Sequence, residues 1–283
     1  MLYDISTSDN ARSWLCDTLK VTGREIILDY AKYHNDLDGF NEKYFKEIVD
    51  IDIENLEIVA FQVTTSDDEC EDIKKNGLRN LKWVLSNDTV MNNYLSKYGI
   101  RVDVDNRSLY TAGDTYNIEY DKTKDTDLLT DEEQLLQDIG YTVYNDYQIN
   151  AFLSCKKIFD YSVVCKAPEF LFRLSELNKD TKEMYINWTN NHEPFVVKFK
   201  AKVNDFDYDT FYHDKQEYED DKNKNWLEMK KKLVLLALNV MLDKNSWEIF
   251  AYMKSDTVIT PDNIIDYVRA EDWNSNTLVQ NSL

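Results

Sequence analysis

The chain of 283 residues carries 53 acidic and 33 basic side chains, which gives a formal net charge of −20. An acidic surface of this kind favours solubility and disfavours unspecific binding to nucleic acids and anionic membranes. With 43% hydrophobic and 13% aromatic residues, the chain can bury a sizeable core, as one large domain or one domain with an appendage. The start of the chain lacks a signal-peptide pattern, and the longest apolar stretch, Leu233 to Leu242, is too short to span a bilayer.

The cysteines and histidines do not form a metal-binding pattern. None of the four cysteines belongs to a CxxC pair, so reduced thiols and a cytoplasmic location are expected. The three histidines, His34, His192 and His213, are scattered and match no HExxH motif. We therefore expect no metal centre.

The N-terminal part reads as helical. Apolar residues recur at helical spacing up to about residue 50, with a break at Gly23. This predicts a helical segment over residues 1–54 that packs on the domain that follows.

The most informative stretch runs from Leu56 to Leu81. Its first half, Ile58 to Thr65, is rich in β-branched and aromatic residues and predicts a buried strand. Ser66 to Asp68 are residue types that begin helices, and Gly77 is placed to end a short helix. On pattern alone, an ordinary strand-helix unit is a sufficient interpretation.

A family resemblance enters at these residues. A strand that ends in Gln62, Thr64 and Thr65, before a short helix closed by Gly77 and a Leu, resembles the NAD-binding opening of ADP-ribosyltransferase folds. The likeness is greatest to the DarT-like and PARP-like branch and its relatives among bacterial toxins and phage-defence proteins. In many of these a His that holds the NAD ribose stands where this chain has Gln62, which can also donate and accept hydrogen bonds.

The middle of the chain predicts short strands and one well-marked helix. Residues 100–105 alternate as a half-exposed strand, and a hairpin is expected around Gly113. Thr130 followed by Glu133 has the form of a capping box that begins a helix, which Gly140 is expected to end.

A second region of interest begins with an expected strand from Tyr147 to Leu153. In ADP-ribosyltransferase folds the second motif is a strand with an aromatic or hydroxyl residue against the nicotinamide. The resemblance therefore implies that Phe152, Ser154 or Tyr161 takes this role. The alternative is that these three residues belong to the core and a loop.

Residues 184–212 predict a pair of strands. Met184, Ile186 and Trp188 alternate, and the lysines at 198, 200 and 202 alternate with apolar residues. These lysines could meet the phosphates of NAD or a polynucleotide, or they could form the wet side of an edge strand. A mostly apolar helix that begins near Asn225 is expected to be buried.

The C-terminal region supplies the most specific likeness. Glu248 stands at the head of an expected strand, followed by Ile259-Thr260-Pro261 and a closing strand. This order resembles the C-terminal catalytic element of DarT-like and PARP-like transferases, in which the Glu is the catalytic carboxylate. The alternative is that Glu248 is one of many acids on a solvated strand face.

The resemblance implies an α+β fold with a mixed or antiparallel split β-sheet of ADP-ribosyltransferase type. The expected organisation is a helical N-terminal segment 1–54, a transferase-like domain 55–273 and a tail 274–283. Glu248 would be catalytic, Gln62, Thr64 and Thr65 would hold NAD by hydrogen bonds, and Gly77 would let the chain turn near the site.

The implied function is NAD-dependent mono-ADP-ribosyl transfer to a nucleic acid or protein, as a toxin or phage-defence effector, with a cognate antitoxin as a further partner. NAD would be the co-substrate, and no membrane partner is expected. The rival interpretation is a non-enzymatic acidic protein, an inhibitor or nucleic-acid mimic that binds a basic partner on a degenerate transferase-like fold. An RNA 2′-phosphotransferase ranks third, because the basic, His-rich site of that activity is not visible.

Overall fold

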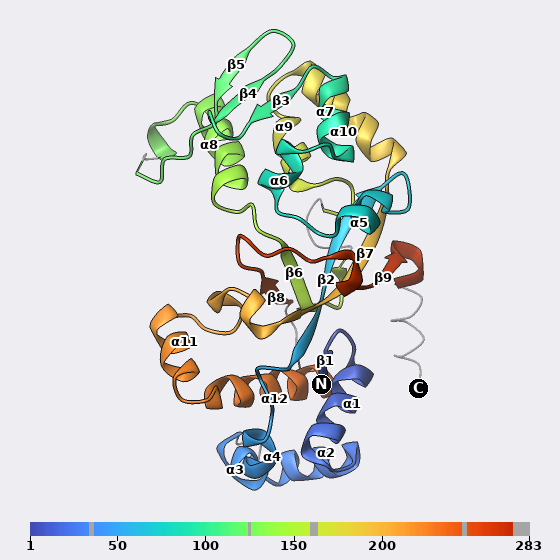
Figure 1. The fold of residues 1–283 in the computed structure, drawn as a ribbon, viewed down its shortest axis with the longest axis vertical. Coiled ribbons are helices and arrows are strands. Elements are labelled where there is room, and N and C mark those ends of the chain that lie inside the picture. Colours follow the sequence, from blue (N-terminus) through green and yellow to red (C-terminus); the bar gives the residue numbers. More distant parts are fainter. Residues whose placement is uncertain (34–36, 124–125, 159–163, 245–247, 274–283) are drawn as a thin grey trace. The chain divides into compact units, whose positions relative to one another are not determined.

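The structure is a computed structural model that describes residues 1–33, 37–123, 126–158, 164–244 and 248–273 (Figure 1). The chain divides into two compact units, each assembled from three stretches. Unit 1 comprises residues 1–62, 150–156 and 198–254, and unit 2 comprises residues 63–149, 157–197 and 255–283. Helices and largely antiparallel sheets confirm the expected α+β class.

The N-terminal helices belong to unit 1, together with two helices from later in the chain. The helices of this unit are α1 (Ser8–Leu19), α2 (Gly23–Lys32), α3 (Leu37–Lys43), α4 (Phe45–Val49), α11 (Lys215–Lys222) and α12 (Leu227–Met241). Helix α1 packs along α12 (Figure 1). Helix α12 buries Leu233, Val234 and Leu238 among others, which confirms that it is a core helix.

A short strand that the sequence did not indicate fixes the N-terminus to unit 1. Strand β1 (Leu2–Tyr3) pairs in parallel with the start of β2 (Glu57–Ser66). The hydroxyl of the fully buried Tyr3 donates to the carbonyl oxygen of Leu233 at 3.0 Å, and its ring lies edge-on to Trp14 at 4.7 Å. The first residues are therefore part of the core.

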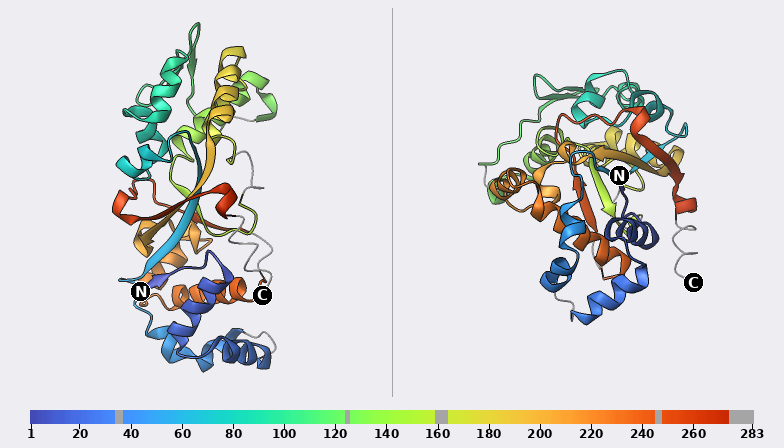
Figure 2. Two further views of the ribbon diagram at one scale, coloured as in Figure 1. Left: turned by 90° about the vertical axis from the view of Figure 1, so that its right-hand side faces the viewer. Right: turned by 60° about the horizontal axis from the view of Figure 1, so that its bottom comes forward.

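The main sheet is built on two long strands, β2 and β7 (Glu193–Lys202), which are neighbours and contribute residues to both units (Figure 2). In unit 1, β6 (Asn150–Ser154) pairs antiparallel with β2, and β8 (Ile249–Tyr252) pairs antiparallel with β6. In unit 2, β9 (Ile264–Arg269) adds to β7. Strand β6 begins later than the expected start at Tyr147, and Glu248, expected at the head of a strand, lies just before β8.

Unit 2 contains a separate antiparallel sheet and its own core. The expected hairpin is present as β4 (Ser108–Tyr110) and β5 (Thr115–Asn117), with β3 (Arg101–Asp103) beside β4. The helices of this unit are α5 (Glu71–Asn76), α6 (Leu81–Ser86), α7 (Val90–Lys97), α8 (Asp131–Tyr144), α9 (Glu169–Leu174) and α10 (Lys179–Asn191). One hydrophobic cluster joins β3, β4 and helices α6 to α10.

Short 3-10 turns complete the chain. They are η1 (Thr126–Leu128), η3 (Val203–Asp205), η4 (Tyr208–Thr210) and η5 (Pro261–Asn263). In the part of the chain that the structure describes, no helix has the length and apolarity needed to cross a membrane.

Helix α8 begins as predicted and ends later than predicted. The Thr130 hydroxyl accepts from the backbone N–H of Glu133 at 3.2 Å, and the Glu133 carboxylate accepts from the N–H of Thr130 at 2.9 Å. Gly140 does not end the helix, which continues to Tyr144. A Cβ at position 140 would collide with the carbonyl oxygen of Ile118, so this glycine allows close packing rather than a turn.

The expected strand over residues 184–188 is wrong, because these residues lie in helix α10. Asn178 caps the helix by accepting from the N–H of Thr181 at 3.0 Å. Met184 and Trp188, four residues apart, are the buried positions, whereas Ile186 is 46% exposed. The apolar pattern therefore follows the helical period and not the period of a strand.

Candidate functional site

The predicted site residues fall into two groups. Gln62, Phe152, Ser154 and Glu248 belong to unit 1. Thr64, Thr65 and Gly77 belong to unit 2. Tyr161 lies outside the described residues.

The side chain of Phe152 packs between two other aromatic rings in unit 1. It lies opposite Phe61 of β2 and opposite Phe250 of β8 in the strand register. Its ring centroid is 5.9 Å from that of Phe61 and 5.3 Å from that of Phe250. The predicted platform for nicotinamide is thus the middle ring of a three-strand aromatic row, and it is only 6% exposed.

Gln62 presents an unusual polar atom. Its Oε1 is buried and accepts no hydrogen bond within the described part of the chain. Because side chains alternate along a strand, Gln62 points to the sheet face opposite Phe61. A buried amide oxygen without a donor is costly, so this atom is a natural acceptor for a ligand that brings one.

Glu248 lies immediately before β8 and is half-buried. Strands β2 and β8 are both antiparallel to β6, so they run in the same direction. Phe61, Phe152 and Phe250 form one row across the three strands. Gln62 follows this row along the strand direction, whereas Glu248 precedes it. From the usual spacings within and between strands, their Cα atoms are roughly 14 Å apart.

Ser154 lies on β6, the strand between β2, which carries Gln62, and β8, which Glu248 precedes. It is 8% exposed and faces Ile249 across an irregularity in the pairing of β6 and β8. A bulge of this kind redirects neighbouring side chains. Ser154 is therefore closer along the sheet to Glu248 than Gln62 is.

Thr64 and Thr65 continue β2 into unit 2 with opposite orientations. Thr65 is 6% exposed, and its hydroxyl oxygen accepts a hydrogen bond from the indole N–H of Trp188 at 2.9 Å. Thr64 is half-buried. The pair that the sequence placed together on NAD is thus divided between the two faces of the strand.

Gly77 closes α5 as predicted and has a second role. Its φ is +73°, a region that favours glycine. The next residue, Leu78, exchanges two backbone hydrogen bonds with Ile259, of 2.9 and 3.2 Å. The two segments that carry the family resemblance, far apart in sequence, are therefore paired within unit 2.

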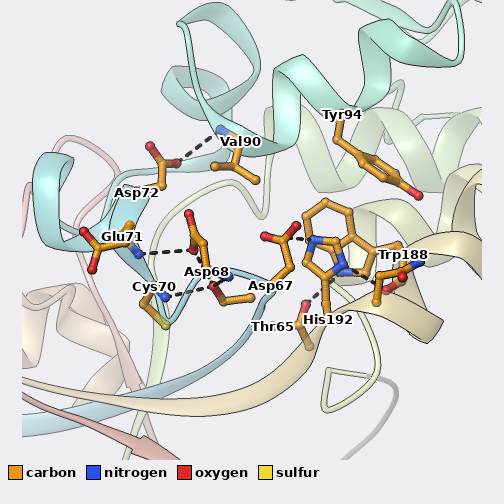
Figure 3. A network of polar contacts seen from close by, with 12 residues as sticks. Thr65, Asp67, Asp68, Cys70, Glu71, Asp72, Val90, Tyr94, Trp188 and His192 are labelled. Carbon is orange, nitrogen blue, oxygen red and sulfur yellow. Dashed lines mark hydrogen bonds and ion pairs between the residues drawn. The ribbon is translucent and has the colours of Figure 1, made fainter.

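A polar and aromatic cluster in unit 2 was not predicted (Figure 3). The imidazole of His192 stacks on the indole of Trp188, with ring centroids 3.7 Å apart and planes inclined by 11°. Tyr94 lies edge-on to both rings. The Asp67 carboxylate points toward His192, with Oδ1 3.7 Å from Nε2.

Burial disfavours the charged form of the histidine at the centre of this cluster. Burial lowers the pKa of His192, although the Trp188 carbonyl and the carboxylates of Asp67 and Asp68 oppose this shift. Its Nδ1 lies 2.9 Å from the Trp188 carbonyl oxygen. Because a carbonyl only accepts, Nδ1 carries the hydrogen and Nε2 presents a lone pair.

The turn between β2 and α5 is tightly organised by side chains. The Ser66 hydroxyl accepts from the N–H of Cys70 at 2.8 Å and donates to Asp68 at 2.7 Å. Glu69 and Cys70 both have positive φ angles, of 57° and 65°. Burial raises the pKa of the Cys70 thiol to about 11, so this cysteine is not a reactive nucleophile.

Two of the three lysines expected to face phosphates or solvent, Lys198 and Lys200, pair with carboxylates. Within the described ranges, no group of three or more His, Cys, Asp or Glu could hold a metal ion. In unit 1, Lys198 pairs with Asp4 at 2.7 Å and Lys200 pairs with Glu57 at 2.9 Å. In the sheet order β7 lies between β2 and β9, so it is not an edge strand over its whole length.

The His192 cluster requires residues 184–188 to be helical, whereas their alternating pattern predicts a strand. Asn178 followed by Thr181 is a helix-start signal, and Trp188 and His192 are then one helical turn apart. This spacing is the signal in the sequence that indicates the cluster.

Comparison of the chain with protein-family models, with curated proteins and with solved structures finds no match.

Proposed function

We propose that this chain is an NAD-dependent mono-ADP-ribosyltransferase that modifies a macromolecule. The observation that carries the proposal lies in unit 1. Gln62, with its unpartnered buried oxygen, lies on β2, and Glu248 immediately precedes β8; β2 and β8 are the two neighbours of β6 in one sheet. The pairing of Leu78 with Ile259 in unit 2 is a second support, because it joins the two segments that resemble the family.

The chemistry requires a carboxylate and hydrogen-bonding groups rather than a metal. Breaking the bond between nicotinamide and ribose develops positive charge on the sugar, which a nearby carboxylate stabilises. Glu248 takes this role and orients the attacking group of the acceptor. Gln62 would accept from a ribose hydroxyl or the carboxamide, which satisfies its buried oxygen. The acceptor is a nucleic acid or a protein, in keeping with a toxin or phage-defence effector.

The proposal is tested by release of nicotinamide from labelled NAD, with cell extract as the source of acceptors. Glu248→Gln should reduce turnover by about 100-fold or more, as expected for loss of a catalytic carboxylate. Gln62→Ala should weaken NAD binding by roughly tenfold, the value of one hydrogen bond to a buried group. Glu47→Gln, at a half-buried position of α4 in unit 1 like that of Glu248, is the matched control and should leave turnover unchanged.

An acidic binding protein is the second candidate, and the net charge of −20 favours it. A partner held by this charge should dissociate steeply as salt rises. Absence of nicotinamide release, together with no NAD-dependent rise in Tm, would reject the transferase and leave this candidate.

A further inference from the structure

The cluster around His192 contains two hydrogen-bond acceptors that face each other. The His192 side chain is 3% exposed, and its Nε2 has no hydrogen-bond partner within the described residues. Asp67 Oδ1 lies 3.7 Å away, beyond hydrogen-bond distance. With Nδ1–H directed at the Trp188 carbonyl, Nε2 and the carboxylate both offer lone pairs, so the gap between them lacks a donor.

Protonation of His192 Nε2 is the simplest way to place a hydrogen-bond donor between this nitrogen and the Asp67 carboxylate. The described residues provide no third metal-binding side chain at this place. Protonation of Nε2 turns the imidazole into a cation with N–H groups at both nitrogens. The new N–H then points at a carboxylate that is close enough to be drawn onto it.

The groups that face His192 come from three elements. The turn after β2 contributes the carboxylates of Asp67 and Asp68, which favour the charged imidazole. Helix α7 contributes the ring of Tyr94, edge-on at 6.0 Å. Helix α10 itself contributes the Trp188 ring and the Trp188 carbonyl. Glu193, which follows His192 in the sequence, forms an ion pair with Arg269 at 2.8 Å.

We propose that Asp67 and His192 form a proton-operated clasp between the end of β2 and the C-terminal end of α10. When Nε2 takes up a proton, the Asp67 carboxylate moves onto it and the 3.7 Å gap closes to a charge-assisted hydrogen bond. Asp67 is free to make this movement because its side chain is 49% exposed and lies in a bend outside β2. His192 is the fixed half, held by stacking and by its Nδ1–H bond.

The clasp acts on the residues that precede Asp67. Thr65 lies two positions earlier and is bonded to Trp188, on which His192 stacks. Closing the clasp therefore fixes the turn to the same helix at a second point.

The test is an NMR titration of the full chain without NAD, from pH 8 to pH 5. The chain has only three histidines, so the imidazole signals are few, and His192→Gln assigns the one of interest. We expect the backbone amides of Asp67 and Asp68 to shift with the same midpoint as the His192 ring. Asp67→Asn should lower that midpoint, because it removes a carboxylate that favours the charged ring.

Asp88→Asn is the matched control, an exposed aspartate of unit 2 that bonds to Asn93, and it should leave the midpoint unchanged. The clasp is rejected if the amides of Asp67 and Asp68 do not follow the ring, or if Asp67→Asn leaves the midpoint where it is. Asp67→Asn alone decides the matter if His192→Gln fails to fold. Since no NAD is present, a failure of the transferase proposal leaves this result unaffected.

Discussion

Gly77 is the residue at which a single added methyl group should be most damaging. Its φ of +73° and the nearby carbonyl oxygen of Ile259 both exclude a Cβ. We expect Gly77→Ala to lower the free energy of unfolding by roughly 3 kcal/mol, the cost of a strained backbone. Urea unfolding measures this, with Gly113→Ala as the control, because a Cβ there meets nothing within 4 Å. Equal stability of the two variants would contradict the close approach of Ile259.

His192 should make stability depend on pH near neutrality. Burial lowers its pKa in the folded state, whereas the unfolded chain has the ordinary value of about 6.5. As the pH falls below that value, the unfolded state binds a proton that the folded state refuses. The free energy of unfolding should then fall by up to about 1.4 kcal/mol per pH unit, until the folded state is protonated too.

Urea unfolding at a series of pH values between 7.5 and 5.5 checks this expectation. His192→Gln should flatten the dependence, and His213→Gln, at an exposed position, should not. Carboxylates with lowered pKa values, such as Asp4 and Asp29, lose their contribution only at more acidic pH. A slope that survives in His192→Gln would place the titrating group elsewhere.

At the scale of elements, helix α8 depends on its first turn. It presents Ile139, Gly140 and Val143 to the interior of unit 2, and its capping box satisfies two backbone groups. Thr130→Ala should lower the free energy of unfolding by about 1 kcal/mol. Thr130→Ser retains the capping oxygen and should cost well under half of that. If both substitutions have the same effect, the loss comes from packing of the methyl group and not from the cap.

The elements also show what the sequence could predict. Strand β2, the end of α5 at Gly77 and the start of α8 follow from local chemistry, namely a β-branched run, a glycine stop and a capping box. The helix start expected at Ser66 to Asp68 is displaced, because β2 runs through Ser66 and α5 begins at Glu71. The sequence of α10 predicts a strand because Met184, Ile186 and Trp188 stand at alternate positions, although only Met184 and Trp188, four residues apart, are buried. Asn178 and Thr181 would have decided the case.

Contacts between residues that are far apart in the sequence could not be predicted from local sequence patterns. The contact of Asp67 with His192 and the bond of Thr65 to Trp188 depend on how β2 and α10 pack. The sequence predicted the segments around Gln62 and Glu248 but not their register. Only the pairing with β6 reveals that these two residues extend away from the Phe61 row in opposite directions.

For the whole molecule, the net charge of −20 should oppose the folded state through self-repulsion. Raising NaCl from about 10 to 500 mM at pH 7.5 should increase Tm by a few degrees, because salt screens the repulsion. Exposed ion pairs such as that of Arg269 with Glu69 contribute little in comparison. The control is pH 4.5, near the isoelectric point, where the salt effect should vanish. A Tm that falls with salt at pH 7.5 would show that attractive pairs dominate.

Because the thiol of Cys70 is buried, the rate at which it reacts can measure how often the turn between β2 and α5 opens. The raised pKa and the 2% exposure of Cys70 protect it from alkylating reagents while the turn is closed. Cys16 and Cys165 are more accessible and would be modified first. Once those two and the buried Cys155 are replaced, slow labelling of Cys70 measures how often the turn opens and Ser66 releases the Cys70 amide.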